Sequence, residues 1–507
     1  FRRVLFRSDA GAALFEDYRR LASVALERPT RIKGDGNRFP SEAVDECLAQ
    51  AGLRPADIDV IALPRVDYPS HYYKLRALFP YPKRKKNGNT DLIRVMSGNF
   101  IGDPESAFDA RRYLADHGFN PKKVFFYNHH LAHALTALFH TRWDDALLYT
   151  SDGGGDRVYY SLRRLRDGRL TDVFGGERDS VSFRRPQHGG DSLGNLYYFV
   201  TEATGFKPLR HEGKVLGLAA FGEPVHADAM KANYRLMPNG EIRALKGMKD
   251  IARQIHALAK ATKKEDMAAS AQKTLEDLTI ASLARALDAN PAKNLGVAGG
   301  VFANVKLTQR IAEKFPFEEI FVYPAMSDQG EATGGALQFL YERDGPEAWL
   351  KQRAPLGNVY FGRDYMDRAD ATILQGAKPV EAPEGLAEAA AKLIAEGKVI
   401  GAYLGRGEYG PRALGARSIM AAPVDRAIND WLNKRLDRTD FMPFAPVVRE
   451  ERCADVFDLP KSLYYSGRYM TVTCNVREAW RAKIPAVVHV DGTARPQLAR
   501  RQDNPTY

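Results

Sequence analysis

The chain has 507 residues, a net charge of +11 and a sequence pI near 9.3. Its share of hydrophobic residues (44%) and of charged residues (27%) is ordinary for soluble globular proteins. No apolar run reaches the length of a membrane span, and the sequence shows no secretory signal pattern, so we expect neither a membrane-spanning helix nor a signal peptide. The length predicts two to four domains, and the basic excess favours anionic ligands, either phosphorylated small molecules or nucleic acid.

The cysteines Cys47, Cys453 and Cys474 are scattered and form no CxxC pair. This pattern supports neither a disulfide framework nor a structural zinc site, and it fits a reducing cytoplasm. The chain begins with Phe1 instead of methionine and stops at Tyr507 without a closing element, so we expect a fragment.

Two stretches follow the same plan of an Asp-Gly turn, a strand, a tight turn and a second strand. They are residues 9–28 and residues 152–177, and only the second has a convincing strand before it. Such a repeat predicts duplicated α/β halves that face each other across a cleft, although two unrelated hairpins remain an alternative. Turns of this kind present backbone N–H groups and a carboxylate to the phosphates of a nucleotide. The turn residues concerned are Asp9, Gly11, Gly153 and Gly154.

Between the two repeats the sequence predicts a helix over 39–51, a strand over 56–63 and a helix over 109–117. Residues 64–104 are rich in Tyr and Pro and are predicted to be a loop-rich insertion. Its basic run, Lys83 to Lys86, is interpreted as a solvated surface.

The stretch 126–156 holds the strongest chemical signal. The end of a strand leads into an apolar helix over 129–140, and a second strand over 146–150 runs into Asp152. On that helix His129 and His133 are four residues apart and share one face, the spacing at which two imidazoles hold one metal ion. Two nitrogens and a carboxylate suit Fe(II) as well as zinc. The alternative is two polar residues near a helix start and an ordinary turn.

Further glycine-rich turns follow strands or open helices. Lys214 lies between Gly213 and Gly217, and a strand over 294–300 ends in two glycines before a helix that begins near 303. A glycine pattern of this kind lets a helix start close to a phosphate. Residues 250–289 have a helical period and are predicted to be scaffold. Asp328, which follows a strand over 319–323, is a third carboxylate for the metal, or alternatively a helix N-cap.

A Pro- and Gly-rich stretch over 345–385 marks a boundary, and a helix over 386–396 and a strand over 399–404 follow it. Beyond this point cationic residues gather in Gly- and Pro-rich turns, where they suit phosphate or carboxylate. They are Arg406, Arg412, Arg417, Lys434, Arg435, Arg438, His489 and Arg495, with Asp491 among them. A basic surface or a nucleic-acid face is the alternative. Against nucleic acid, these residues do not line a helix with interleaved aromatics.

Seven motifs, in chain order, carry a resemblance to a known family. They are HHLAHA, SDGGGD, HEGKVLGLAAFG, GGVFANVKL, SDQGEATGGAL, GRGEYGPRALGARSI and FMPFAP. With them, nearly the whole chain resembles the O-carbamoyltransferases of nodulation and antibiotic biosynthesis. The resemblance implies an N-terminal domain over 1–345 with duplicated, RNase H-like halves of the actin/Hsp70-like ATPase fold. It further implies a boundary over 346–385 and an α/β, YrdC-like C-terminal domain over 386–507.

The resemblance also implies an activity and a set of site residues. Such enzymes make carbamoyl adenylate from carbamoyl phosphate and ATP, with Mg²⁺, and transfer the carbamoyl group to a hydroxyl of a small-molecule acceptor. The metal, Fe(II) or another divalent ion, and the catalysis would involve His129, His133, Asp152 and Asp328. By resemblance the nucleotide would contact Gly299, Gly300, Asn304 and Gly330, and the glycine-rich turns add Asp9, Gly11, Gly153, Gly154 and Lys214 as candidates. By resemblance the carbamoyl phosphate site would draw on Arg412, Arg417, Lys434 and Arg438, and the C-terminal turns add His489 and Arg495 as candidates.

Two departures from the family pattern accompany the resemblance. Residues 1–8 do not look like the first strand of the fold, which we therefore expect to be missing together with a general base. The C-terminal domain stops early. Alternatives are an enzyme like the tRNA threonylcarbamoyl transferases, or a nucleotide-gated binding module. We expect no nucleic-acid or membrane partner, and a homodimer is compatible with the resemblance. We also expect the two domains to carry separable half-reactions.

Overall fold

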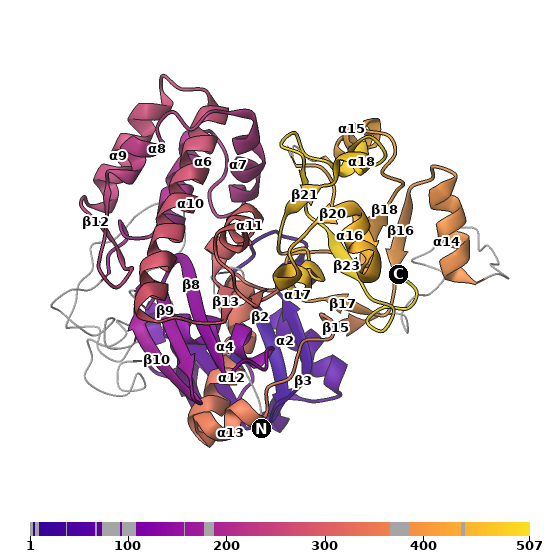
Figure 1. Cartoon of the computed structure of the whole chain (residues 1–507). Coiled ribbons are helices and arrows are strands. Elements are labelled where there is room, and N and C mark those ends of the chain that lie inside the picture. The colour runs from indigo at the N-terminus through magenta and orange to yellow at the C-terminus, as the bar shows by residue number, and fades with distance from the viewer. Residues whose placement is uncertain are drawn as a thin grey trace.

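The computed structural model describes residues 4–5, 10–36, 38–65, 68–72, 92–93, 108–156, 158–176, 187–365, 385–437 and 442–507. Some sequence predictions fall wholly or partly outside these residues: Asp9, Arg438, most of the insertion over 64–104 with its basic run Lys83 to Lys86, and residues 366–384 of the boundary. The described part contains two five-stranded sheets with helices between and around them, and a C-terminal part built of smaller sheets (Figure 1).

The two large sheets have the same strand order and direction. In each, three consecutive strands are antiparallel, and two later strands extend the sheet in parallel from the first of the three. The first sheet contains β1 (Val4–Leu5), β2 (Gly11–Glu16), β3 (Arg19–Ala25), β4 (Val60–Pro64) and β7 (Lys123–Tyr127). The second contains β8 (Asp145–Gly155), β9 (Val158–Arg166), β10 (Arg169–Phe174), β13 (Asn294–Ala298) and β14 (Glu319–Val322). The predicted duplication, and with it the actin/Hsp70-like type of α/β fold, is confirmed.

The expectation that the first strand is missing is corrected by β1. Its residue Val4 pairs antiparallel with Ala13 of β2 and parallel with Ala62 of β4. The flanking arginines hid this strand in the sequence, because two apolar residues are too short a run to show a period. A strand at the centre of a sheet is held by pairing on both sides, so a short one suffices.

The helices α4 (His129–Phe139) and α12 (Glu331–Asp344) lie between the two sheets. Their apolar residues share one core cluster with residues from both sheets. Alternate residues of a strand face opposite sides of a sheet, and β8 follows this rule. Ala146 and Leu148 face that inner cluster, whereas Leu147 and Tyr149 face the outer core of the second half. This inner layer carries the predicted metal ligands.

Other helices cover the outer faces of the sheets. On the first half they are α1 (Glu27–Thr30), α2 (Ser41–Ala51) and α3 (Ala110–Ala115). On the second half they are α6 (Leu193–Ala203), α7 (Glu212–Leu218), α8 (Ala227–Lys231), α9 (Met248–Ala259), α10 (Lys264–Ala289) and α11 (Val305–Lys314), with a hairpin of β11 (Tyr234–Leu236) and β12 (Ile242–Ala244). The predicted scaffold over 250–289 is therefore two helices. None of the helices in the described residues is long and apolar enough to cross a membrane.

Part of the expected boundary segment is ordered against the N-terminal halves. In α13 (Pro346–Lys351) the buried Trp349 donates a hydrogen bond from Nε1 to the carbonyl of Leu337 at 2.9 Å. Further on, β15 (Tyr360–Asp364) pairs antiparallel with β17 (Arg406–Glu408). These residues therefore connect the inner layer to the C-terminal part.

The C-terminal part lies beside both halves in Figure 1 and packs directly on the second sheet. Tyr465 stacks on Phe321 of β14, with ring centroids 4.3 Å apart, and donates its hydroxyl hydrogen bond to the carbonyl of His140 at 2.7 Å. Its helices are α14 (Leu386–Ala395), α15 (Ala427–Arg435), α16 (Cys453–Val456), α17 (Tyr464–Gly467) and α18 (Glu478–Arg481). Its other strands are β16 (Ile400–Tyr403), β18 (Arg417–Met420), β19 (Val447–Arg449), β20 (Phe457–Asp458), β21 (Cys474–Val476), β22 (Thr493–Ala494) and β23 (Gln497–Ala499). The YrdC-like character of this part stays a prediction.

Candidate metal centre and arginine loop

The inner helix α4 lies between the two sheets and carries the two predicted histidine ligands in its first two turns. Asn128 caps the helix by accepting a hydrogen bond from the backbone N–H of Leu131 at 2.8 Å, which satisfies one of the free N–H groups of the first turn. His129 and His133 then lie one turn apart on the same face. Both side chains are buried, so their ring nitrogens need polar partners inside the protein.

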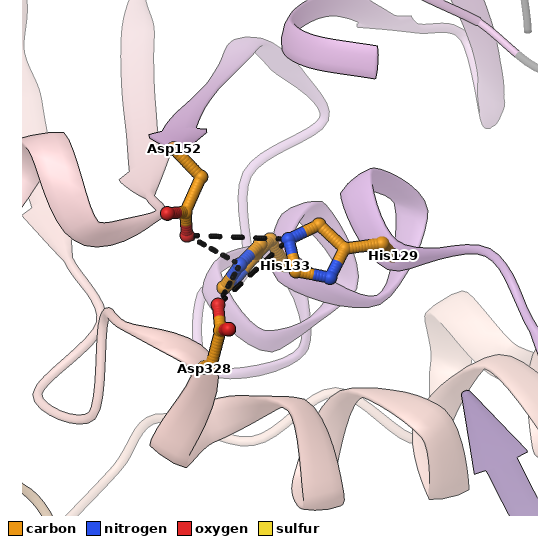
Figure 2. Close-up of side chains that lie close together, drawn as sticks. All are labelled: His129, His133, Asp152 and Asp328. Atoms are coloured by element: carbon orange, nitrogen blue, oxygen red, sulfur yellow. Dashed lines mark ion pairs between the residues drawn. The ribbon is translucent and has the colours of Figure 1, made fainter. Parts of the chain in front are cut away.

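Two carboxylates from different strand ends face these imidazoles (Figure 2). Asp152 lies near the end of β8, and its Oδ2 is 3.3 Å from Nε2 of His133 and 4.0 Å from Nε2 of His129. Asp328 follows β14, and its Oδ1 is 3.8 Å from both of these nitrogens. The sequence prediction that these four side chains share one centre agrees with this geometry.

The donor set fits a divalent metal ion. One ligand atom from each of His129, His133, Asp152 and Asp328 lies within 4.8 Å of the others. Ligands about 2.0–2.2 Å from a tetrahedral ion are roughly 3.3–3.6 Å apart, so a small contraction of the cluster would complete a site. Imidazole nitrogen with carboxylate oxygen suits zinc and Fe(II) alike, and the geometry does not choose between them.

Glycine is required where β8 passes α4. A Cβ on Gly155 would lie 2.2 Å from the ring of His129, so only glycine leaves room for that imidazole. The next residue, Asp156, accepts a hydrogen bond from the backbone N–H of His129 at 3.0 Å. On the other side of the cluster, the N–H of Gly300 donates to Oδ2 of Asp152 at 3.0 Å. Asp156, directly after β8, thus holds the start of α4, and Gly300 holds the carboxylate of Asp152.

Glu331 is a site residue that the sequence analysis missed. It is the first residue of α12, only 2% exposed, and its two carboxylate oxygens lie 3.4 Å from Nδ1 of His129 and 3.4 Å from Nδ1 of His133. Burial raises the pKa of Glu331 well above its ordinary value, more than the neighbouring His133 lowers it. A signal existed in the sequence, because Glu331 is a charged residue in a Gly/Ala-rich helix of buried type, three residues after Asp328.

Electrostatics also mark this cluster as a cation site. Burial alone lowers the pKa of His133, but the carboxylates of Glu331, Asp152 and Asp328 raise it well above its ordinary value. The carboxylates of Asp152 and Asp328 thus lie beside the two imidazoles in a buried place. A divalent cation would offset the charge of these carboxylates.

The intervening His130 has a different environment. Its Nδ1 lies 2.8 Å from the hydroxyl of Thr150 and its Nε2 lies 2.9 Å from the carbonyl of Val158. Burial, with the neighbouring His129 and His133, lowers the pKa of His130 well below its ordinary value. His130 is therefore a neutral packing residue beside the two predicted ligands.

The residues predicted to contact a nucleotide lie at several places around the cluster. Gly300 contacts Asp152 as described, and Asn304 exchanges amide hydrogen bonds with Gln272 at 2.7 and 3.2 Å while it caps α11. A Cβ on Gly330 would lie 2.1 Å from the carbonyl of Ala325, so close packing alone requires glycine at this position. Their nucleotide contacts stay predictions, as do those of Gly11, Gly153, Gly154, Lys214 and Gly299.

A cleft of about 230 Å³ begins next to Asn304 and runs between α7, α10 and α11 of the second half and the C-terminal part. Lys306 crosses it and donates to Oδ2 of Asp491 at 2.8 Å, and His489 lies 3.3 Å from the other carboxylate oxygen. The residues lining it are Leu216, Ala219, Ala220, Gly222, Pro224, Ala269, Gln272, Lys273, Glu276, Val305, Lys306, Arg310, Met442, Thr473, His489, Asp491 and Thr493. Of the predicted substrate residues, the cleft contains His489. It adds Lys306 and Arg310, whose i, i+4 spacing on α11 was readable in the sequence.

The glycine-rich segment 405–419, here called the arginine loop, is shaped by Glu408. One carboxylate oxygen of Glu408 accepts hydrogen bonds from the backbone N–H groups of Leu414, Ala416 and Arg417 at 2.8, 2.9 and 3.0 Å. The hydroxyl of the next residue, Tyr409, donates to the backbone carbonyl of Gln329. The loop therefore contacts the turn that carries Asp328, although the two are far apart in the sequence.

The predicted substrate arginines of this loop have opposite surroundings. The guanidinium of Arg417 donates to the carbonyls of Leu404, Gly405 and Ala416 at 2.9–3.1 Å and stacks on the ring of Tyr403. Arg412 has a buried Nε and makes no hydrogen bond or ion pair within the described residues. Burial lowers the pKa of Arg412 to about 10. Arg412 is thus a half-buried cation with no anion among the described residues, whereas the hydrogen bonds of Arg417 hold its own loop.

The remaining predicted substrate residues lie apart from the metal cluster. Lys434 is exposed on α15, and Arg495 is half-buried beside β22. Arg406 donates to the carbonyls of Gly362 and Leu21 at 2.9 Å each, which ties the start of the loop to the first half. Their roles toward a substrate stay predictions.

Comparison with solved structures finds loose likenesses. HypF from T. kodakarensis aligns with 70% of this chain and 50% of its own, at 12% identity and a TM-score of 0.36. Component A of (R)-2-hydroxyglutaryl-CoA dehydratase from Acidaminococcus fermentans aligns with 69% of this chain and 99% of its own, at 12% identity and a TM-score of 0.35. The fold assignment therefore rests on the strand order described above.

Sequence relatives are much closer. The nodulation protein NolNO of Sinorhizobium fredii is 34% identical over 522 residues, which cover 99% of this chain and 71% of that protein. The nodulation protein NolO of Bradyrhizobium diazoefficiens is 33% identical and covers 75% of this chain and 68% of its own. A protein of Methanocaldococcus jannaschii, MJ1058, is 31% identical and covers 96% of this chain and 86% of its own.

Two family descriptions account for most of the sequence. Residues 3–337 match the carbamoyltransferase N-terminus and residues 391–507 match the carbamoyltransferase C-terminus. The first match contains the predicted metal ligands and the second contains the arginine loop. The chain belongs to the carbamoyltransferase family.

Proposed function

We propose that this carbamoyltransferase takes its carbamoyl group from carbamoyl phosphate, activates it with ATP as carbamoyl adenylate, and transfers it to a hydroxyl of a small-molecule acceptor. The observation that supports this best is the contact between the arginine loop and the turn of Asp328. It brings the half-buried guanidinium of Arg412, which has no anionic partner among the described residues, and a cluster of metal-binding type into one region of the protein.

The proposed reaction consists of an activation stage and a transfer stage. Water releases phosphate from carbamoyl phosphate, and the carbamate oxygen attacks the α-phosphorus of ATP, so that pyrophosphate leaves. The acceptor hydroxyl then attacks the carbonyl carbon of the adenylate, loses its proton, and AMP leaves. The carbamate readily loses CO₂ and the adenylate hydrolyses readily, so the site has to exclude bulk water once phosphate has been released.

Within this proposal the chain's own residues bind and orient the reactants. Arg412 provides a charge-assisted contact to the phosphate of the donor, where its burial makes the contact strong. The cleft beside Asn304 holds the nucleoside, with Lys306 and Arg310 near its phosphates. A divalent ion at the two histidines and two aspartates would polarise a carbonyl or hold a phosphate as a Lewis acid, and Fe(II) is the ion we propose.

Phosphorus NMR of the purified protein with ATP and carbamoyl phosphate tests the activation step. The proposal expects AMP and pyrophosphate in equal amounts, formed only when carbamoyl phosphate is present. Formation of ADP would indicate a kinase and contradict it. If ATP stays intact in the presence of donor and acceptor, the alternative of a nucleotide-binding module is supported. Carbamoylation of tRNA in place of a small molecule would identify the alternative enzyme class.

We further propose that Asp328 serves the transfer step more than the activation step. Because Asp328 belongs to the metal cluster and Arg412 to the arginine loop, Asp328→Ala should retain pyrophosphate release and lose transfer to the acceptor. AMP release would then be uncoupled from product. If Asp328→Ala stops pyrophosphate release as completely as it stops transfer, both half-reactions share one site.

A further inference from the structure

We infer that Glu331 is a positioning residue that orients both metal-binding imidazoles at once. This inference rests on the metal centre proposed above. One carboxylate oxygen of Glu331 lies 3.4 Å from Nδ1 of His133 and the other lies 3.4 Å from Nδ1 of His129. The opposite nitrogens, the two Nε2 atoms, face Asp152 and Asp328.

A carboxylate that accepts from Nδ1–H leaves Nε2 without a proton, and only an unprotonated nitrogen binds a metal ion. A histidine that binds a metal usually has its own acceptor for this purpose. Here a single side chain offers one oxygen to each of two imidazoles. Glu331 therefore selects the same tautomer in both rings and fixes the direction in which both Nε2 atoms point.

The position of Glu331 follows from the packing of α12 against α4. A Cβ on Gly334 would lie 2.6 Å from the backbone carbonyl of Ala132, so this glycine lets the two helices approach closely. Asp328 lies in a short 3₁₀ turn, Asp328–Gly330, that leads directly into α12. One chain segment thus supplies a predicted ligand and, three residues later, the residue that orients the two others.

A purely structural role for Glu331 does not account for its surroundings. It is 2% exposed, and among the residues that the structure describes its oxygens have no hydrogen-bond partner; their polar contacts are the two 3.4 Å pairs with the imidazoles. A buried carboxylate without hydrogen bonds costs stability, so packing alone does not explain Glu331 at this place. Direct ligation is also disfavoured, since Glu331 faces the Nδ1 side of both rings and the two aspartates face the Nε2 side.

The variant Glu331→Gln tests this inference. The amide keeps one acceptor oxygen and replaces the other with an NH₂ donor of nearly the same shape. The imidazole that faces the NH₂ group must then accept at Nδ1 and carry its proton on Nε2, where it no longer binds a metal. We expect the dissociation constants for Zn(II) and Co(II), measured by calorimetry, to rise by about 10- to 100-fold. The Co(II) absorption spectrum should change because one nitrogen ligand is lost.

Glu319→Gln is the matched control. Glu319 accepts a hydrogen bond from the indole of Trp143 at 2.8 Å at the far end of β14, so the same exchange there should leave metal binding unchanged. If Glu331→Gln does not fold, Glu331→Asp serves instead. It keeps the charge and withdraws both oxygens by about 1.5 Å, and metal binding should again weaken.

The outcomes separate this inference from the metal centre itself. If wild-type protein binds neither ion, the metal centre is contradicted, and so is the proposed role of Glu331. Wild-type binding together with unchanged affinity in a folded Glu331 variant would overturn the role of Glu331 alone. Loss of binding as complete as in His133→Ala would make Glu331 a ligand instead of a positioning residue.

Discussion

The hydroxyl of Tyr409 donates a hydrogen bond to the backbone carbonyl of Gln329, the residue that directly follows Asp328. Beside it, Arg28 donates to the carbonyl of Gly410. The arginine loop is thereby held against the first half and against the metal-ligand turn. The motifs of the metal cluster and of the arginine loop are far apart in the sequence, but this contact brings the two segments together in space.

Tyr409→Phe should weaken this connection. Loss of the buried hydrogen bond should lower the free energy of unfolding by about 0.5–1.5 kcal/mol, and the rate of transfer should fall because the loop is no longer fixed to the turn of Asp328. Tyr68→Phe is the control, since its buried hydroxyl donates to the backbone carbonyl of Pro64 at 2.7 Å in the first half, away from the arginine loop. Equal transfer rates in the two variants would show that the contact has no role in catalysis.

Replacement of either predicted histidine ligand should abolish metal binding. His129→Ala and His133→Ala each remove one nitrogen from a small cluster, and elemental analysis after loading with Fe(II) should find the metal lost. His130→Asn is the control, because both ring nitrogens of His130 are used by Thr150 and Val158. It should lower the melting temperature and retain the metal. Stoichiometric iron in either alanine variant would contradict the metal assignment.

The two arginines of the arginine loop should respond differently to replacement by alanine. Arg412→Ala removes the proposed phosphate contact, worth about 1.5–3 kcal/mol, so the KM for carbamoyl phosphate should rise roughly 10- to 150-fold with the KM for the acceptor little changed. Arg417→Ala should instead lower the melting temperature, since it loses three hydrogen bonds to backbone carbonyls. An unchanged KM for carbamoyl phosphate in Arg412→Ala would show that Arg412 does not bind the donor.

The ion pair of Lys306 and Asp491 across the cleft beside Asn304 should make stability depend on pH. Burial raises the pKa of Asp491, but hydrogen bonds from His489, Lys306 and Thr493 outweigh it and hold that pKa well below the ordinary value. Because the folded pKa is depressed, the stabilisation is fully present above about pH 4 and is lost as the pH falls further.

Urea unfolding of wild type and Asp491→Asn between pH 7 and pH 3 measures this effect. The two should differ by about 1 kcal/mol at pH 7, a value reduced for partial exposure of the carboxylate, and the difference should shrink below pH 4. The exposed pair of Glu347 and Lys351 provides a control, and Glu347→Gln should have no measurable effect at any pH. A difference independent of pH would show that Asp491 acts through packing.

Close packing of α12 on α4 predicts a large effect at Gly334. Gly334→Ala would place a Cβ 2.6 Å from the carbonyl of Ala132, so the helices must separate, and about 1–3 kcal/mol of stability should be lost. At Gly213 of α7 a Cβ meets no atom within 4 Å, so Gly213→Ala should be neutral or slightly stabilising. Thermal denaturation of both variants checks this, and equal melting temperatures would contradict the packing argument.

Much of the fold could be predicted from the sequence because it is built on local periodicity. The repeated Asp-Gly hairpins predicted duplicated halves, and the spacing of His129 and His133 predicted a shared face. Asp152 and Asp328 could be added since both follow strands, and strand ends of one sheet meet at the same edge. These predictions need only the geometry of one helix and one sheet.

The features that were missed depend on contacts between distant segments. Glu331 contacts the two histidines only because α12 packs against α4. Tyr409 contacts the turn of Asp328 only because the arginine loop reaches it. Arg412 and Arg417 have the same side chain in the same loop, yet one has three carbonyl partners and the other has none among the described residues. No spacing rule separates them.

Isotope transfer tests the central claim most directly. The protein is loaded with Fe(II) and supplied with ATP, ¹³C-labelled carbamoyl phosphate and a panel of hydroxylated small molecules, and products are analysed by mass spectrometry. The account predicts a ¹³C-labelled carbamate ester on one acceptor, with one AMP and one pyrophosphate per ester, and its loss in His133→Ala. A labelled ester formed equally well by His133→Ala, or formed without AMP, would contradict the account.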